Sequence, residues 1–274
     1  MKLLNIDANP KTVKGQAHGY MTAILYLAPW KLSGVNVCPT AELAGCRRSC
    51  LNTAGRAGIS ADTFRVGGNT LPDNAIQRAR IARTRFFHEH RAAFIEQLCT
   101  EIAAFVRTAE RKGFKPCVRL NGTSDLPWEN LGGEPLKAYP HGYGRGLPDL
   151  FPTVQFYDYT KLPSRLLGSR LPANYHLSIS WSGHNRDYQT RAEYLARQTG
   201  APLVVVDSEG FRKDGSIDEM VWHRLFQIKA RADCKEIVNG DEHDLRFLHE
   251  PHTLVVLRAK GAARKESNGF VLEI

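Results

Sequence analysis

Cysteine is the residue whose spacing in this chain first suggests chemistry. Cys38, Cys46 and Cys50 occur at the spacing C-x7-C-x3-C, in a stretch rich in glycine and polar residues. Thiolates are soft ligands that suit zinc and iron–sulfur clusters. Structural zinc usually takes cysteines in closely spaced pairs, whereas three cysteines can hold three irons of a cubane cluster and leave the fourth iron open. We therefore predict a [4Fe–4S] cluster on these three cysteines. A zinc site with a fourth ligand elsewhere, or unligated thiols, are the alternatives.

Disulfide bonds are not expected, because nothing in the chain suggests secretion. The N-terminal sequence Met-Lys-Leu-Leu-Asn-Ile-Asp carries charge too early for a secretory signal. The remaining cysteines are scattered through predicted helix or strand, and we interpret them as packing residues: Cys99, Cys117 and Cys234. The first three cysteines also have basic neighbours that would offset the negative charge of a thiolate-bound cluster: Arg47, Arg48 and Arg56.

The elements that must position these residues alternate between strands and helices. Short apolar runs predict strands over residues 22–28, 116–120, 153–157, 176–179, 203–206 and 253–257. A helical pattern opens at Asp73 or Asn74 and stops at Gly113, and a second helix is predicted over 186–199. Apolar strands separated by helices are typical of a parallel sheet buried on both faces. We expect a single α/β domain over residues 1–274, forming a partial (β/α)6-type barrel. A long cysteine-bearing loop, residues 30–72, would follow its first strand. A doubly wound sheet is the alternative.

Polar residues follow several of these strands, at the sheet edge where parallel α/β folds place their active sites. Asn121, Thr123, Ser124 and Asp125 follow the second predicted strand, and Asp158 follows the third. We predict that these five residues line a cofactor pocket. The alternative is an Asx turn or a helix cap with no ligand.

Three further places in the sequence each allow two interpretations. Tyr159 and Lys161 could supply a proton donor and an anion contact, or could be a buried tyrosine and a surface lysine. Trp181 could stack on a base or pack in the core. The turn before the last strand contains Asp241, His243 and Asp244, which resemble a hard-metal or proton-transfer cluster. We favour the alternative, a structural turn that holds Arg246 in an ion pair.

The composition points to an anionic partner without identifying one. The chain of 274 residues has 37 Lys and Arg against 28 Asp and Glu, so its formal charge is 37 − 28 = +9. Arginine, which binds phosphate and carboxylate bidentately, supplies 24 of the basic residues. The densest run lies in the first turns of the long helix, at Arg78, Arg80, Arg83 and Arg85. It could form a nucleic-acid-binding face or a solvated basic surface.

The sequence lacks the motifs of several other protein classes. No apolar run approaches the ~18 residues of a membrane span, so we expect a soluble intracellular protein. The sequence has no P-loop, no G-x-G-x-x-G after a strand and no H-E-x-x-H. ATPase, dinucleotide-binding and zinc-protease functions are therefore unsupported.

Five motifs in order, NVCPTAELAGCRRSCLNTAGRAG, RLNGTSDLPWE, QFYDYTK, LPANYHLSIS and NGDEHDLRF, resemble the bacteriophage gene-product-88-like family. That resemblance implies a phage or prophage protein acting in bacterial cytoplasm. The chain is also remotely similar to radical S-adenosylmethionine (SAM) enzymes, which place three cysteines after the first strand of a partial barrel. Their usual spacing is C-x3-C-x2-C. Residues 132–135, GGEP, look like the glycine-rich SAM motif of these enzymes, but we interpret them as a loop coincidence because RLNGTSD occupies the expected place.

Together these observations predict an iron–sulfur protein of phage origin with a radical-SAM-like barrel. It would use SAM in radical chemistry on a nucleotide or another anionic substrate, and no catalytic residue is assigned. The alternative is a non-catalytic iron–sulfur or zinc protein that binds nucleic acid through an arginine-rich face.

Overall fold

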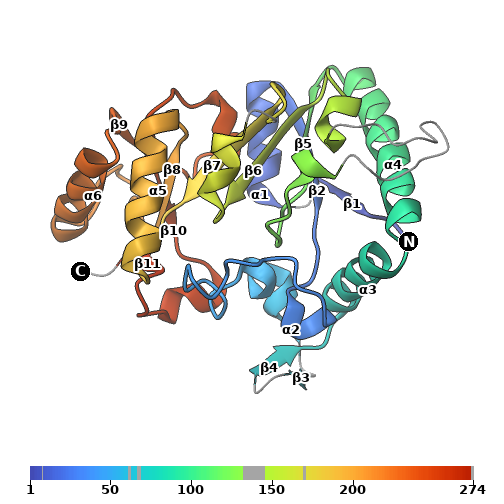
Figure 1. The fold of residues 1–274 in the computed structure, drawn as a ribbon, viewed down its shortest axis with the longest axis horizontal. Coiled ribbons are helices and arrows are strands. Elements are labelled where there is room, and N and C mark those ends of the chain that lie inside the picture. The colour runs from blue at the N-terminus through green and yellow to red at the C-terminus, as the bar shows by residue number, and fades with distance from the viewer. Residues whose placement is uncertain (8, 61–62, 67–68, 132–145, 169–170, 273–274) are drawn as a thin grey trace. The chain divides into compact units, whose positions relative to one another are not determined.

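A computed structural model describes residues 1–7, 9–60, 63–66, 69–131, 146–168 and 171–272 (Figure 1). The chain divides into two compact units. The first comprises residues 1–38, 59–158 and 169–176, and the second comprises residues 39–58, 159–168 and 177–274. The motif at 132–135 lies outside the described residues.

The first unit is built on strands β1 (Leu4–Ile6), β2 (Tyr20–Leu25), β5 (Lys115–Arg119) and β6 (Gln155–Thr160), whose last two residues belong to the second unit. Their hydrogen-bonded order is β1-β2-β5-β6. β2, β5 and β6 are parallel, and β1 runs antiparallel to β2. A separate antiparallel hairpin joins β3 (Thr63–Val66) to β4 (Asn69–Pro72).

The helices of the first unit are α1 (Pro10–Lys14), α2 (Trp30–Ser33), α3 (Ala75–Glu89) and α4 (Arg91–Arg111). Asn74 caps α3 by accepting the amide of Gln77 at 3.0 Å. Gly113 follows α4 in the left-handed conformation, with φ +77°. The predicted long helix is therefore confirmed in its cap and its stop, but it is two helices, because the backbone of His90 leaves helical geometry. Apolar residues at helical spacing along these two helices are all buried: Phe87, Phe94, Leu98, Ile102 and Phe105.

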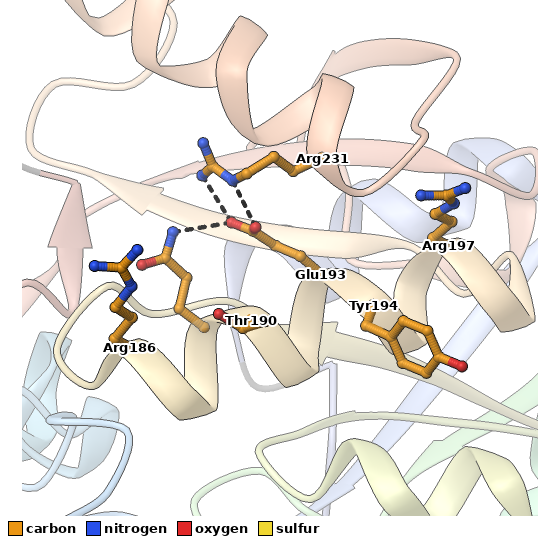
Figure 2. A pocket seen from close by; sticks show the side chains of 7 residues that line it. Arg186, Thr190, Glu193, Tyr194, Arg197 and Arg231 are labelled. Atoms are coloured by element: carbon orange, nitrogen blue, oxygen red, sulfur yellow. Dashed lines mark hydrogen bonds and ion pairs between the residues drawn. The ribbon is translucent and has the colours of Figure 1, made fainter.

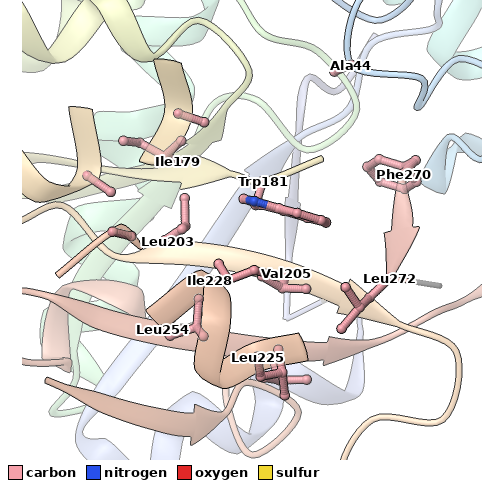
Figure 3. Close-up of a cluster of buried hydrophobic side chains, with 14 of the residues drawn as sticks. Ala44, Ile179, Trp181, Leu203, Val205, Leu225, Ile228, Leu254, Phe270 and Leu272 are labelled. Atoms are coloured by element: carbon pink, nitrogen blue, oxygen red, sulfur yellow. The ribbon is translucent and has the colours of Figure 1, made fainter. Parts of the chain in front are cut away.

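The second unit contains β7 (Tyr175–Ser180), whose first two residues belong to the first unit, β8 (Leu203–Asp207), β9 (Glu236–Asn239), β10 (Thr253–Arg258) and β11 (Val271–Leu272). The order is β7-β8-β10-β9, β11 also pairs with β8, and all these pairings are parallel. Helices α5 (Arg186–Thr199) and α6 (Glu219–Arg231) contribute apolar residues to a buried cluster with these strands. Figure 3 shows part of this cluster, including Leu225 and Ile228 of α6.

Short 3-10 helices occupy many of the connections: η1 (Gly15–His18), η2 (Leu51–Thr53), η3 (Gly55–Gly58), η4 (Trp128–Asn130), η5 (Leu147–Leu150), η6 (Pro163–Leu167), η7 (Arg246–Leu248) and η8 (Gly261–Lys265). No helix in the described part of the chain is long and apolar enough to cross a membrane.

The predicted α/β class is confirmed. Each of the six predicted strands overlaps an observed one, and the helix predicted over 186–199 is α5. The first strand was predicted wrongly, because β1 precedes the strand that the sequence suggested. Residues 30–72 are also more structured than a loop, since they hold α2, η2, η3 and the β3–β4 hairpin. The strand pairings do not establish a barrel.

Candidate functional site

Four of the five predicted cofactor-binding residues follow β5, and the fifth lies in β6. Asn121 is the centre of this group. Its backbone amide donates to Asp158 Oδ1 at 2.8 Å, and its side-chain Nδ2 donates to Asp158 Oδ2 at 3.2 Å. Tyr175 on β7 donates its hydroxyl to the same Oδ2 at 2.7 Å. Neighbouring parallel strands thus bring together residues that are 37 positions apart in sequence, as predicted.

The amide side chain of Asn121 makes every hydrogen bond available to it. Nδ2 also donates to the Leu126 carbonyl at 3.0 Å, and Oδ1 accepts from Ser124 Oγ at 2.8 Å, the Leu126 amide at 2.9 Å and Trp128 Nε1 at 3.2 Å. Asn121 and Asp158 are 2% and 1% exposed. We refer to Asn121, Ser124, Asp158 and Tyr175 as the strand-end network; it is a satisfied polar core.

The other two predicted residues hold the loop that follows β5. Thr123 Oγ1 donates to the Leu27 carbonyl at 2.6 Å, and the amide of Asp125 donates to the Val37 carbonyl at 2.8 Å. Arg119 Nε lies 3.9 Å from Asp158 Oδ1, with the arginine side chain 12% exposed. These contacts support the structural alternative for the group, and the cofactor role of its residues stays a prediction.

Cys46 and Cys50 lie in the second unit, and Cys38 is the last residue of the first segment of the first unit. Cys50 Sγ accepts the amide of Asn52 at 3.4 Å, which caps η2. Cys46 is 9% exposed and belongs to the buried cluster, with Sγ 3.6 Å from the Ala41 carbonyl. Cys38 is half-buried, and its amide donates to Asn36 Oδ1 at 3.0 Å.

The segment that carries Cys46 and Cys50 is fixed to the C-terminal part of the second unit. Ser49 Oγ donates to Glu266 Oε2 at 2.6 Å, and Asn268 Nδ2 donates to the Gly45 carbonyl at 2.8 Å. Gly45 has φ +67°, and a Cβ built on it would lie 2.5 Å from the imidazole of His184. These hydrogen bonds and this close contact fix the segment that carries Cys46 and Cys50.

The three remaining cysteines behave as packing residues, as predicted. Burial, assisted by the carboxylate of Glu96, raises the pKa of Cys99 to about 12. Burial also raises the pKa of Cys234 to about 11. Cys117 is fully buried, and its sulfur lies 3.2 Å from Thr22 Oγ1. Cys99 and Cys234 are therefore protonated thiols at neutral pH. Within the described residues, no group of three or more His, Cys, Asp or Glu side chains is arranged to hold a metal ion.

The arginines of α3 do not form one basic face. Arg80 and Arg83 are only 7% and 9% exposed. Arg80 lies over the ring of Tyr26, 4.8 Å from its centroid, and Arg83 Nε donates to the Lys2 carbonyl at 2.8 Å. One of the two interpretations, a face formed by all four arginines, is contradicted by the burial of Arg80 and Arg83; Arg78 and Arg85, seven residues apart, are the exposed pair of this run.

The turn before β10 holds Arg246 through hydrogen bonds, as expected of a structural turn, and the ion pair expected for this arginine stays a prediction. This arginine is fully buried and donates to the Gly240 carbonyl at 2.6 Å, to Tyr159 OH at 2.8 Å and to the carbonyl of His243. Tyr159 in turn donates to Asp244 Oδ1 at 3.0 Å. Asp241 accepts the Arg258 amide at 2.7 Å. This polar cluster therefore has a structural explanation.

Trp181 and Lys161 pack against other side chains of the second unit. Trp181 is 5% exposed, and its Nε1 donates to Glu193 Oε1 at 2.9 Å. Lys161 Nζ lies 5.7 Å from the centroid of the Phe270 ring. Core packing of Trp181, one of the two interpretations, is confirmed.

A surface pocket of about 520 Å³ on α5 and α6 was not predicted (Figure 2). Its lining includes Arg186, Glu193, Tyr194 and Arg197 from α5 and Arg231 from α6. The sequence contains a signal for the α5 side, because these α5 residues recur at helical spacing. No sequence spacing relates Glu193 to Arg231.

Comparison with known proteins identifies the family. A family model described as Gene product 88 matches residues 2–273, which confirms the resemblance carried by the five motifs. It adds nothing to the similarity to radical SAM enzymes. Searches of curated proteins and of solved structures gave no match. The chain belongs to the Gene product 88 family.

Proposed function

We propose that this phage-type protein binds an iron–sulfur cluster through Cys38, Cys46 and Cys50. The observation that carries the proposal is the hydrogen bond from the Asn52 amide to Cys50 Sγ. An N–H donor favours the charged form of the group that accepts it, and hydrogen bonds to sulfur tune iron–sulfur clusters. Burial raises the pKa values of Cys99 and Cys234, which disfavours thiolates at these two positions.

The chemistry of the donor set fits this group. Soft thiolates select iron–sulfur clusters or zinc, and the anchoring of Ser49 to Glu266 positions the segment between Cys46 and Cys50. A bound cluster would supply electron transfer or an open iron for a ligand. The chain's own contribution is to hold the sulfurs and to donate the Asn52 amide.

The finer architecture is also part of the proposal. A partial (β/α)6-type barrel is supported by the order of the parallel strands, because β2-β5-β6 in the first unit and β7-β8-β10 in the second follow chain order. SAM binding stays a prediction for Asn121, Thr123, Ser124, Asp125 and Asp158. Within the strand-end network, polar atoms of these residues already form hydrogen bonds with one another. Action in bacterial cytoplasm follows only from the family.

Anaerobic purification, followed by iron, sulfide and zinc analysis, tests the cluster. We expect about four irons per chain for an intact cubane, and loss of iron in Cys38→Ala, Cys46→Ala and Cys50→Ala. Cys99→Ala and Cys234→Ala are matched controls that should retain the wild-type metal content. Stoichiometric zinc without iron, or equal iron loss in the controls, would contradict the proposal.

A further inference from the structure

The pocket on α5 and α6 carries an excess of positive charge. Its lining has three arginines, Arg186, Arg197 and Arg231, and one acidic residue, Glu193, so the net charge is 3 − 1 = +2. Figure 2 shows Arg186 and Arg197 on α5 on either side of Glu193 along the helix. Charge of one sign in a surface hollow attracts an oppositely charged ligand.

Arg231 neutralises Glu193. Its Nε and Nη2 donate to the two carboxylate oxygens of Glu193 at 2.6 and 2.8 Å. Although burial alone would raise the pKa of Glu193, the hydrogen bonds from Arg231, Trp181 and Gln189 lower it. Glu193 is therefore ionised at neutral pH and already balanced, which leaves the charges of Arg186 and Arg197 for a ligand.

Arg186 and Arg197 form no ion pair with any residue that the structure describes, and both are exposed. They are 11 residues apart on one helix, which places their backbones about 16 Å apart on the same side, at 1.5 Å per residue. Tyr194 lies between them in sequence and is 57% exposed. The helix thus presents an aromatic ring between two cations.

We propose that this pocket binds single-stranded nucleic acid, with phosphates at Arg186 and Arg197 and a base stacked on Tyr194. Arginine binds phosphate bidentately, and proteins that bind single strands combine a cationic groove with aromatic stacking. A duplex fits less well, because its bases are stacked on one another and offer no free face to Tyr194. This inference goes beyond the proposed cluster and does not depend on it.

Fluorescence anisotropy of a labelled oligothymidylate with the full chain, titrated with salt, tests the proposal. We expect Arg186→Ala and Arg197→Ala each to weaken binding and to lower the slope of log K against log salt by about 0.7. Tyr194→Ala should weaken binding about tenfold, as a lost stacking contact does. Tyr194→Phe should bind like wild type because it keeps the ring.

Arg191→Ala is the matched control, since Arg191 is an exposed arginine of α5 outside the pocket lining. It should bind like wild type, and a duplex of equal length should bind more weakly than the single strand. Thermal melting of each variant shows that the helix remains folded. Absence of binding by the wild type, equal loss in Arg191→Ala, or an unchanged affinity in Tyr194→Ala would overturn the proposal.

Discussion

One buried carboxylate from each unit, Asp158 from the first and Glu193 from the second, illustrates two ways of balancing such a group. In the first unit, Asp158 has a fully buried side chain and accepts hydrogen bonds from the neutral donors Asn121 and Tyr175, with Arg119 Nε 3.9 Å from its Oδ1. In the second unit, Glu193 has a side chain 6% exposed, and Arg231, whose side chain is 45% exposed, binds it through two hydrogen bonds.

The difference lies in where the balancing groups are. Asn121 and Tyr175 donate their hydrogen bonds to Asp158 inside a buried polar core, so this carboxylate stabilises the ends of β5 and β6. The partner of Glu193 is half-exposed and borders a pocket with further cations. A buried charge at a strand end is therefore no sign of a ligand site by itself, whereas a neutralised carboxylate beside unpaired arginines is compatible with one.

The largest effect is expected from removing the carboxylate of the strand-end network. Asp158→Ala leaves the Asn121 amide, the Asn121 side chain and the Tyr175 hydroxyl without their acceptor. We expect a loss of about 3–5 kcal/mol in the free energy of unfolding, measured by urea denaturation. The exposed Glu110→Ala serves as control and should change it by less than about 0.5 kcal/mol. If Asp158→Ala also lowered the free energy of unfolding by less than about 0.5 kcal/mol, the strand-end network would not be structural.

A smaller effect is expected in the second unit. Arg231→Met removes two hydrogen bonds from Glu193 but leaves those from Trp181 and Gln189. Because Arg231 is half-exposed, water can replace part of its interaction, and we expect a loss of about 1–2 kcal/mol in urea denaturation. Arg224→Met, at an exposed position of the same helix, should be near neutral. A loss as large as that of Asp158→Ala would erase the contrast between the units.

The smallest effect is expected in the pH dependence of the free energy of unfolding. The pKa of Glu193 is lowered in the folded chain, so its stabilisation is complete above the ordinary glutamate pKa of about 4.3 and disappears as pH falls through the lowered value. Unfolding free energy measured from pH 5 downward should therefore fall less steeply in Glu193→Gln than in wild type. Identical slopes would mean that the pKa of Glu193 is the same in both states.

Much of the fold could be predicted because its parallel strands are short, apolar and separated by helices. Three of the strands that sequence reasoning missed are too short or too exposed to be recognised. β1 and β11 span only Leu4–Ile6 and Val271–Leu272, and β9 is a half-buried edge strand, so none has a distinct apolar pattern. The break at His90 was missed because the apolar spacing of α3 and α4 continues across it.

The candidate site could be predicted only in part. Position at a strand end brought Asn121 and Asp158 together correctly, but the closure of their network depends on Tyr175 and Trp128, which no local spacing relates to them. The exposed arginines of α5 were not singled out, because arginine density pointed only to the run at 78–85. That signal was misleading on α3, where Arg80 and Arg83 occupy the buried side of the helix.

Gly45 affects how tolerance to mutation near the cysteines should be interpreted. Any side chain at this position meets the imidazole of His184 and must also adopt a left-handed backbone. Variation at Gly45 is therefore restricted by steric fit, independently of any metal. A glycine retained at position 45 among related sequences would report the shape of the chain and carry no evidence that the neighbouring Cys46 binds metal.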